Sequence, residues 1–265
     1  KQLENENYDI EELNLVTEER VPEDADMLFI MSPKRDLSED EENKIREYLE
    51  DSGRVVFLMD FLDVEIPRFE GILKSYGVGL SGAMVVEEDT NRFMNFPIWL
   101  VPKLGSHEIL KPIKSGDMFA LLPYAQPIEE LDTKRRSLEI ESLLTTSDAA
   151  WGKLDLDEQD LEKSDGSLSG PFELALAVTD KPDNYEDEPT KLIVIGGSRF
   201  LDSQFLGQVP GNLNLMLNSF NWLQDREESI SIRPKSLGLK RLRMTQQQSL
   251  IMSGVAVILI PAIIL

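Results

Sequence analysis

The sequence predicts an α/β domain with a mostly parallel sheet flanked by helices, followed by a C-terminal transmembrane helix. Residues 27–31 (MLFIM) and 55–59 (VVFLM) are continuous apolar runs on either side of an amphipathic segment. Such runs are typical of strands covered on both faces and joined by a right-handed crossover. The third observation is the charge-free stretch Met244–Leu265. As a helix, these residues would span a bilayer core of about 30 Å.

This C-terminal stretch favours a membrane span over a buried helix of a soluble domain. From Leu250 onward its residues are nearly all apolar, Pro261 lies inside it, and no polar face recurs at helical spacing. A buried helix is the usual interpretation of shorter runs of about 10 to 14 residues. The prediction is therefore a domain at 1–232, a basic juxtamembrane linker at 233–243 and a truncated span at 244–265.

Composition excludes several classes of function. The chain has 49 acidic and 27 basic residues, a net charge of −22, so its surface repels nucleic acid phosphates. It has no cysteine, which removes thiol catalysis, cysteine-bound zinc and disulfides. Lys1 opens on polar sequence without a signal peptide, so an exported domain would require residues upstream.

Helix and strand signals follow one another through the first third of the chain. Ser38 and Glu41 have capping-box spacing, and Gly53 at C′ would end the helix that they start. A second helix is expected at 67–76, before Gly77 and Gly79, and a short strand at 84–86.

Strands are also expected in the remainder of the chain. The middle part, about 90–180, lacks convincing helices and predicts an antiparallel or irregular insert on the parallel core. Parallel character returns at 191–195, and 211–223 has the pattern of a helix. The other predicted strands are 8–16, 96–101, 118–122, 138–144, 172–178 and 229–232.

Two segments that follow predicted strands form the candidate ligand pocket. Asp60 ends VVFLMD, and Gly196, Gly197, Ser198 and Arg199 follow KLIVI. Open α/β sheets bind ligands beyond the carboxyl ends of their strands, and backbone N–H groups of such a loop can cradle an anion. VVFLMD is similar to a Walker B strand, but the chain has no phosphate loop. The alternative interpretations are a structural role for Asp60 and a tight strand-to-loop turn at residues 196–199.

No enzymatic or metal-binding pattern emerges, so we expect no catalytic residues, metal or cofactor. Asp155, Asp157, Glu158 and Asp160 fail the calcium-loop pattern because Gln159 and Asp160 stand where an Asp or Asn and a Gly are needed. His107 is the only histidine, and the sequence has no nucleophile-elbow serine that it could activate. We expect it in a loop or at the start of a strand.

A basic cluster precedes the predicted span. Beside a membrane, its side chains would bind lipid headgroups. The positive-inside rule would place them in the cytoplasm, which conflicts with an exported domain, although long domains translocate largely regardless of charge. The orientation therefore stays open. The cluster is Arg233, Lys235, Lys240, Arg241 and Arg243.

Colinear segments over most of the chain resemble a known family. They begin with VPEDADMLFIMSPKRDLSEDEENKIREYLEDSGRVVFLMD and continue with SDGSLSGPFELALAV, KLIVIGGSRFL, GNLNLMLNSFNWL and SISIRPK. This order resembles the extracytoplasmic domain of the GldG-like auxiliary component of gliding-motility-type ABC transporters. Ser52-Gly53 stands where family members often have two glycines, a departure that touches only a turn.

The resemblance implies a subunit partnered with an ABC permease and its ATPase, anchored in the cell membrane with its main domain extracytoplasmic. It also implies a membrane helix and a first sheet strand upstream of Lys1. Its flavodoxin- or amidotransferase-like domain is shared with a ciliary transport protein for which saccharide binding has been suggested. No catalytic residues are implied.

Three hypotheses follow for the function. The leading one is a non-enzymatic, membrane-anchored subunit that contacts the permease, a substrate or the envelope, with envelope polysaccharide and membrane lipid among its partners. The second is a saccharide- or anion-binding receptor module at Asp60 and residues 196–199. The third is an amidotransferase-like enzyme, which lacks support because such sites need a cysteine or a placed histidine.

Overall fold

The computed structural model describes Leu3, Glu6 and residues 8–154, 161–182 and 188–226. The chain divides into two units, Lys1–Ile232 and Arg233–Leu265, and every described residue lies in the first. The predicted strand at 229–232, the linker and the membrane span thus lie outside the described residues. Within the described ranges, no helix is long and apolar enough to cross a membrane.

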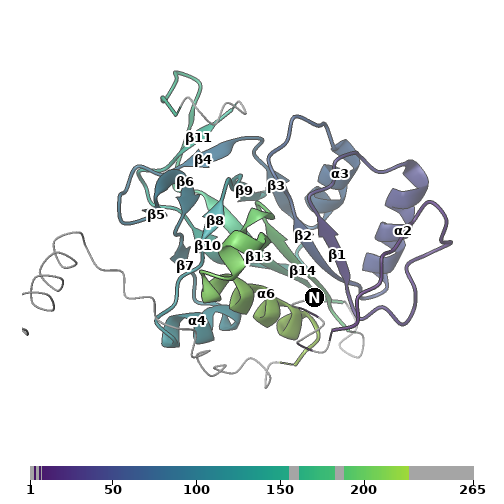
Figure 1. The fold of residues 1–265 in the computed structure, drawn as a ribbon. Helices are drawn as coiled ribbons and strands as arrows, with labels where there is room; N and C mark the ends of the chain where they lie inside the picture. The colour runs from purple at the N-terminus through teal and green to yellow at the C-terminus, as the bar shows by residue number, and fades with distance from the viewer. Residues whose placement is uncertain (1–2, 4–5, 7, 155–160, 183–187, 227–265) are drawn as a thin grey trace, which may run out of the picture. The chain divides into compact units, whose positions relative to one another are not determined.

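A mixed sheet of eight strands forms the centre of the described part of the domain, with helices packed against it (Figure 1). Its path runs β1–β2–β14–β13–β10–β7; β9 also pairs with β13 and in turn with β3. The strands are β1 (Leu28–Met31), β2 (Arg54–Leu58), β3 (Val78–Leu80), β7 (Lys103–Leu104), β9 (Ile128–Glu130), β10 (Leu138–Thr145), β13 (Glu173–Asp180) and β14 (Thr190–Ile195).

A helix connects the parallel strands β1 and β2, and two smaller sheets complete the architecture in the described residues. The small sheets have the orders β12–β11–β4 and β5–β6–β8. The helices are α2 (Glu39–Glu50), α3 (Pro67–Ser75), η1 (Glu108–Leu110), α4 (Lys111–Ser115), η2 (Arg199–Leu201), α5 (Ser203–Leu206) and α6 (Pro210–Leu223). The small-sheet strands are β4 (Met84–Val86), β5 (Phe93–Met94), β6 (Phe96–Leu100), β8 (Leu122–Pro123), β11 (Trp151–Lys153) and β12 (Leu168–Ser169).

The prediction of a mostly parallel sheet is wrong. Only β1, β2 and β14 pair in parallel among the described strands, and the remaining pairings are antiparallel. The two long strands β10 and β13 belong to this same sheet and continue it beyond β14. Parallel pairing requires a crossover connection, usually a helix. The described residues of the connection between β13 and β14 form no helix, and Asp180 pairs directly with Thr190 across that connection.

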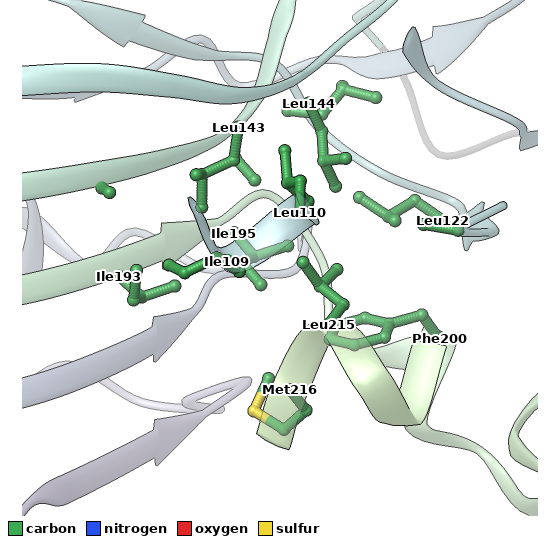
Figure 2. Packing of buried hydrophobic residues seen from close by; sticks show 14 of the residues in the cluster. Ile109, Leu110, Leu122, Leu143, Leu144, Ile193, Ile195, Phe200, Leu215 and Met216 are labelled. Atoms are coloured by element: carbon green, nitrogen blue, oxygen red, sulfur yellow. The ribbon is translucent and has the colours of Figure 1, made fainter. Parts of the chain in front are cut away.

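The parallel strands are covered on both faces, as their apolar runs predict. Val55 and Phe57 of β2 face α2 and α3 in one core cluster, whereas Val56 and Leu58 face α6 in another. Strand β14 alternates in the same way. Figure 2 shows the α6 side, where Leu215, Met216 and Phe200 pack near Ile193 and Ile195. This burial on both faces stabilises the fold, because each large apolar side chain contributes about 1.5–3 kcal/mol.

Strand β1 departs from the predicted full burial because it lies at the end of the strand path. Met31 is 54% exposed, although Phe29 still packs edge-on against Phe220 of α6. The apolar run alone could not distinguish an edge strand from a central one.

The start of α2 is confirmed, but its end differs from the prediction. Ser38 accepts a hydrogen bond from the Glu41 backbone, and Glu41 reciprocates at the Ser38 N–H, which completes the capping box. After the helix, Ser52 rather than Gly53 takes the left-handed conformation, with φ 59°. Gly53 is required for space instead, since a Cβ there would lie 2.3 Å from the Tyr48 carbonyl oxygen.

Helix α6 is buried around most of its surface, which explains its asparagines. The Asn212 side chain bonds the backbone N–H and C=O of Leu121 and the carbonyl of Phe200. Asn218 donates to the carbonyl of Ile109. These amides satisfy backbone groups of neighbouring loops that would otherwise be buried without partners.

Two predicted strands are wrong. Residues 8–16 form no strand: Tyr8 packs on Phe220 on the α6 side, whereas Leu15 packs in the α2 cluster, so the segment passes from one face of the sheet to the other. In 118–122, only Leu122 enters a strand, β8. The other predicted strands and helices within the described residues are present, with ends shifted by one or two residues.

Candidate functional site

Three polar residues meet at the carboxyl ends of the parallel strands. Ser32 follows β1, Asp60 lies just beyond β2 and Ser198 lies beyond β14. Because parallel strands end at the same edge of the sheet, these side chains come together although they are far apart in sequence. With Lys34 we call them the strand-end cluster.

The Asp60 carboxylate is the centre of this cluster. The Ser198 backbone N–H donates to Oδ1 at 2.5 Å, and the Ser198 hydroxyl donates to Oδ2 at 2.9 Å. The Ser32 hydroxyl also donates to Oδ2, at 2.5 Å. Lys34 Nζ lies 2.8 Å from the Ser32 hydroxyl oxygen and donates to it. The structure thus joins Asp60 directly to the predicted glycine loop.

The loop donates to an anion, but that anion belongs to the protein itself. The predicted role for residues 196–199 is to present backbone N–H groups to a ligand. In the structure, the Ser198 N–H points at Asp60, and a carboxylate that accepts several hydrogen bonds is well stabilised. The arrangement therefore acts as a polar brace between the ends of β1, β2 and β14.

A close backbone approach holds the loop in place. The Gln126 N–H donates to the Gly196 carbonyl at 2.6 Å, and the Gln126 side chain donates to the Met59 carbonyl at 2.7 Å. A Cβ on Gly196 would lie 2.0 Å from the Gln126 carbonyl oxygen, so only glycine fits. Gln126 thereby bridges the ends of β2 and β14.

Arg199, the last residue of the predicted pocket, points to a different neighbour. Its guanidinium lies 4.1 Å from the centre of the Tyr124 ring, a distance typical of a cation–π contact. Arg199 is exposed. It and Lys34 place two cations near the strand ends.

Sequence reasoning missed Ser32 and Lys34. A signal for Ser32 was present, since MSPK follows the first predicted strand as directly as Asp60 follows the second. Applying the strand-end rule to every predicted parallel strand would have found Ser32. Its left-handed backbone, with φ 48°, could not be predicted from a serine.

A groove among the described residues lies elsewhere. It has a volume of about 590 Å³ and is lined by the ends of α2 and α3 and by the connection between β9 and β10. The lining includes neither Asp60 nor residues 196–199. Since α2 leads back to the start of β2, the groove is at the amino ends of the parallel strands, opposite the strand-end cluster.

His107 has a structural environment. It is buried, and its Nδ1 accepts a hydrogen bond from the Ile109 N–H, which caps η1. Its ring packs edge-on against Trp222 of α6, and Nε2 lies 3.7 Å from Glu141. The histidine therefore fixes η1 against α6.

The other candidate residues of the sequence fall outside what the structure describes or form no site. The basic cluster from Arg233 to Arg243 and the acidic residues 155–160 are not among the described residues. Within the described ranges, no group of three or more histidine or acidic side chains is arranged to hold a metal ion.

One comparison with a known structure shows a shared fold. The chain is similar to the mmIFT52 N-terminal domain, with 16% sequence identity, 74% of this chain and 76% of that chain covered, and a TM-score of 0.53. A ThuA-like protein from Bacteroides uniformis matches with 16% identity, 75% and 69% coverage and a TM-score of 0.35. Comparison with curated proteins gives no match.

A family model gives the assignment. The model described as an ABC-type uncharacterized transport system matches residues 1–222. This range includes every strand of the central sheet, the strand-end cluster and nearly all of α6. The chain therefore belongs to this family of auxiliary components of an ABC-type transport system.

Proposed function

We propose that this auxiliary component is a non-enzymatic, membrane-anchored subunit whose α/β domain lies outside the membrane and contacts the permease of the transport system. The observation that carries the non-enzymatic part is the strand-end cluster. In the fold's usual ligand position, Asp60 accepts hydrogen bonds from Ser32 and Ser198. Its oxygens are thus engaged in bracing the strands.

The environment of His107 supports the same proposal. A general base needs a free lone pair close to the group that it deprotonates. Nδ1 of His107 accepts the Ile109 N–H within the core, so this lone pair is committed to a backbone contact. The chain has no cysteine, so a nucleophile of the kind used by many amidotransferase-like enzymes is absent from it.

The membrane anchor rests on the sequence of residues 244–265. This stretch has no charged residue, and a basic segment at 233–243 precedes it. Headgroup contacts of such a segment contribute about 1 kcal/mol for each basic residue near an anionic surface. A tethered domain would remain close to the permease.

Affinity purification of the full-length protein from its own membrane tests the proposal. We expect recovery of an ABC permease and its ATPase after mild solubilisation. The control is residues 1–232 alone, without the 244–265 stretch and without any helix upstream of Lys1, which should appear in the soluble fraction without these partners. Recovery of the full-length protein alone, from the soluble fraction, would contradict both the anchor and the partnership.

A receptor module for saccharides or anions is the second candidate. The exposed cations Lys34 and Arg199 at the strand ends favour it, because they could meet an anionic group beside the internal brace. The double variant Lys34→Gln, Arg199→Gln tests this candidate. Loss of saccharide or anion binding, with the free energy of unfolding unchanged, would support it over a purely structural role.

A further inference from the structure

The groove at the amino ends of the parallel strands brings together cationic side chains from distant parts of a strongly acidic protein. Of its eight lining residues, four are cationic, whereas the chain carries a net charge of −22. Three different segments supply the cations. They are Arg46 from α2, Lys74 from α3, and Lys134 and Arg135 from the connection between β9 and β10.

Carboxylates that do not line the groove hold these cations in place. Arg46 donates to Glu42 through Nε at 2.9 Å and also to the Ser75 hydroxyl at 3.3 Å. Lys74 donates to Glu70 at 2.9 Å.

The two cations of the β9–β10 connection are held in the same way. Arg135 pairs with Asp180 at 2.8 Å, and Lys134 pairs with Glu130. An ammonium has three donors and a guanidinium has five, so such pairs fix the cation's position and leave donors for a ligand. Side chains fixed in this way lose little entropy on binding.

The groove also has an aromatic wall. The Arg135 guanidinium lies over the Tyr76 ring at 5.0 Å from its centre. Stacking orients the planar guanidinium, which is the group best suited to bidentate contacts with phosphate or carboxylate. Glu50 is the one acidic residue of the lining, so an anionic ligand would need enough negative groups to offset its repulsion.

We propose that this groove binds a multivalent anion, one that carries at least two phosphate or carboxylate groups. Each groove cation is paired with a carboxylate, so the ligand binds through the donors that these pairs leave unused. Charges farther away than about 8 Å are screened at physiological ionic strength. The site differs from the strand-end position at which α/β sheets usually bind ligands. The proposal does not depend on the membrane anchor or on the partners.

Titration calorimetry of the full chain in detergent with tripolyphosphate tests the site at low salt. The groove variant carries Lys74→Gln and Lys134→Gln, two exposed or half-buried lysines whose changes leave Arg46 and Arg135 intact. The matched control carries Lys111→Gln and Lys114→Gln on α4, which removes the same charge from exposed positions outside the groove lining. A third variant, Arg241→Gln with Arg243→Gln, removes charge from the basic cluster.

We expect the groove variant to weaken tripolyphosphate binding by about tenfold or more, since charge-assisted hydrogen bonds are strong. The control and the basic-cluster variant should bind as the unchanged chain does. A Lys74→Arg, Lys134→Arg variant should restore binding, and matching unfolding midpoints would show that all variants are folded.

A second arm distinguishes the sources of the anion. Co-sedimentation with cardiolipin vesicles, whose headgroup carries two phosphates, would assign a lipid headgroup if it depends on the two groove lysines. Tripolyphosphate binding alone would assign a soluble ligand. Absence of tripolyphosphate binding, or a loss that follows the basic-cluster variant and not the groove variant, would overturn the proposal.

Discussion

At the scale of single residues, Asp60 shows how a predicted ligand site can be a structural brace. Its carboxylate takes three hydrogen bonds from Ser32 and Ser198. An acid just beyond a buried strand has the same sequence signature whether its acceptors face a ligand or the protein. Removing the carboxylate distinguishes these two roles.

We predict that Asp60→Ala lowers the free energy of unfolding by about 1–3 kcal/mol, because it leaves a backbone N–H and two hydroxyls without their acceptor. Urea denaturation of the full chain in detergent measures this change. The matched control is Asp63→Ala, at an exposed position nearby, which should change stability by less than about 0.5 kcal/mol. An Asp60→Ala protein as stable as the control would show that the cluster is no brace.

At the scale of secondary-structure elements, the start of α2 combines a capping box with an ion pair. Glu41 accepts from the Ser38 N–H at 2.8 Å and from both terminal nitrogens of Arg35, at 3.0 and 2.7 Å. The hydrogen bond from Arg35, helped by Ser38 and opposed by burial, lowers the pKa of Glu41 from 4.5 to about 2. The ionised carboxylate therefore stabilises the folded state.

Because the pKa is lowered on folding, this stabilisation is complete above pH 4.5 and is lost as the pH falls towards 2. We predict that Glu41→Gln costs about 1–2 kcal/mol at pH 7. The difference from the unchanged chain should shrink steadily between pH 4.5 and 2. Denaturant unfolding over this pH series measures it.

Glu39→Gln, at an exposed position of the same helical turn, is the control for general charge effects. A pH-independent difference for Glu41→Gln would contradict the assigned role of the ionised carboxylate.

The helices also differ in how much of their structure can be predicted from the sequence. The capping box and the apolar face of α2 depend on residues within a few positions of one another, so Ser38 and Glu41 could be identified without the structure. The asparagines of α6 could not be interpreted in this way. Asn212 is buried because the distant residues Leu121 and Phe200 need its amide.

At the scale of the whole molecule, the proposed orientation places the described domain outside the membrane. The absence of cysteine makes this testable with single cysteines. We predict that a membrane-impermeant maleimide labels Glu23→Cys in intact spheroplasts, because this side chain is 79% exposed.

Ala175→Cys, at a fully buried position of β13, should react only after denaturation and controls for access. Labelling of Glu23→Cys only after lysis would place the domain in the cytoplasm and contradict the proposal.

The amino-acid sequence alone was sufficient to predict the α/β class, the parallel unit β1–α2–β2 and the return to parallel pairing at β14. It also predicted that Asp60 lies near the loop at residues 196–199, which follows β14. These features follow from local periodicity, from capping and from the common direction of parallel strands. The tertiary structure decided that β10 and β13 continue the same sheet in antiparallel order. It also decided that the loop's N–H binds Asp60 and that the cationic groove lies at the opposite end of the strands. Each of these features depends on contacts between residues that are distant in the chain. Local sequence preferences do not distinguish such a contact from the alternative strand pairings.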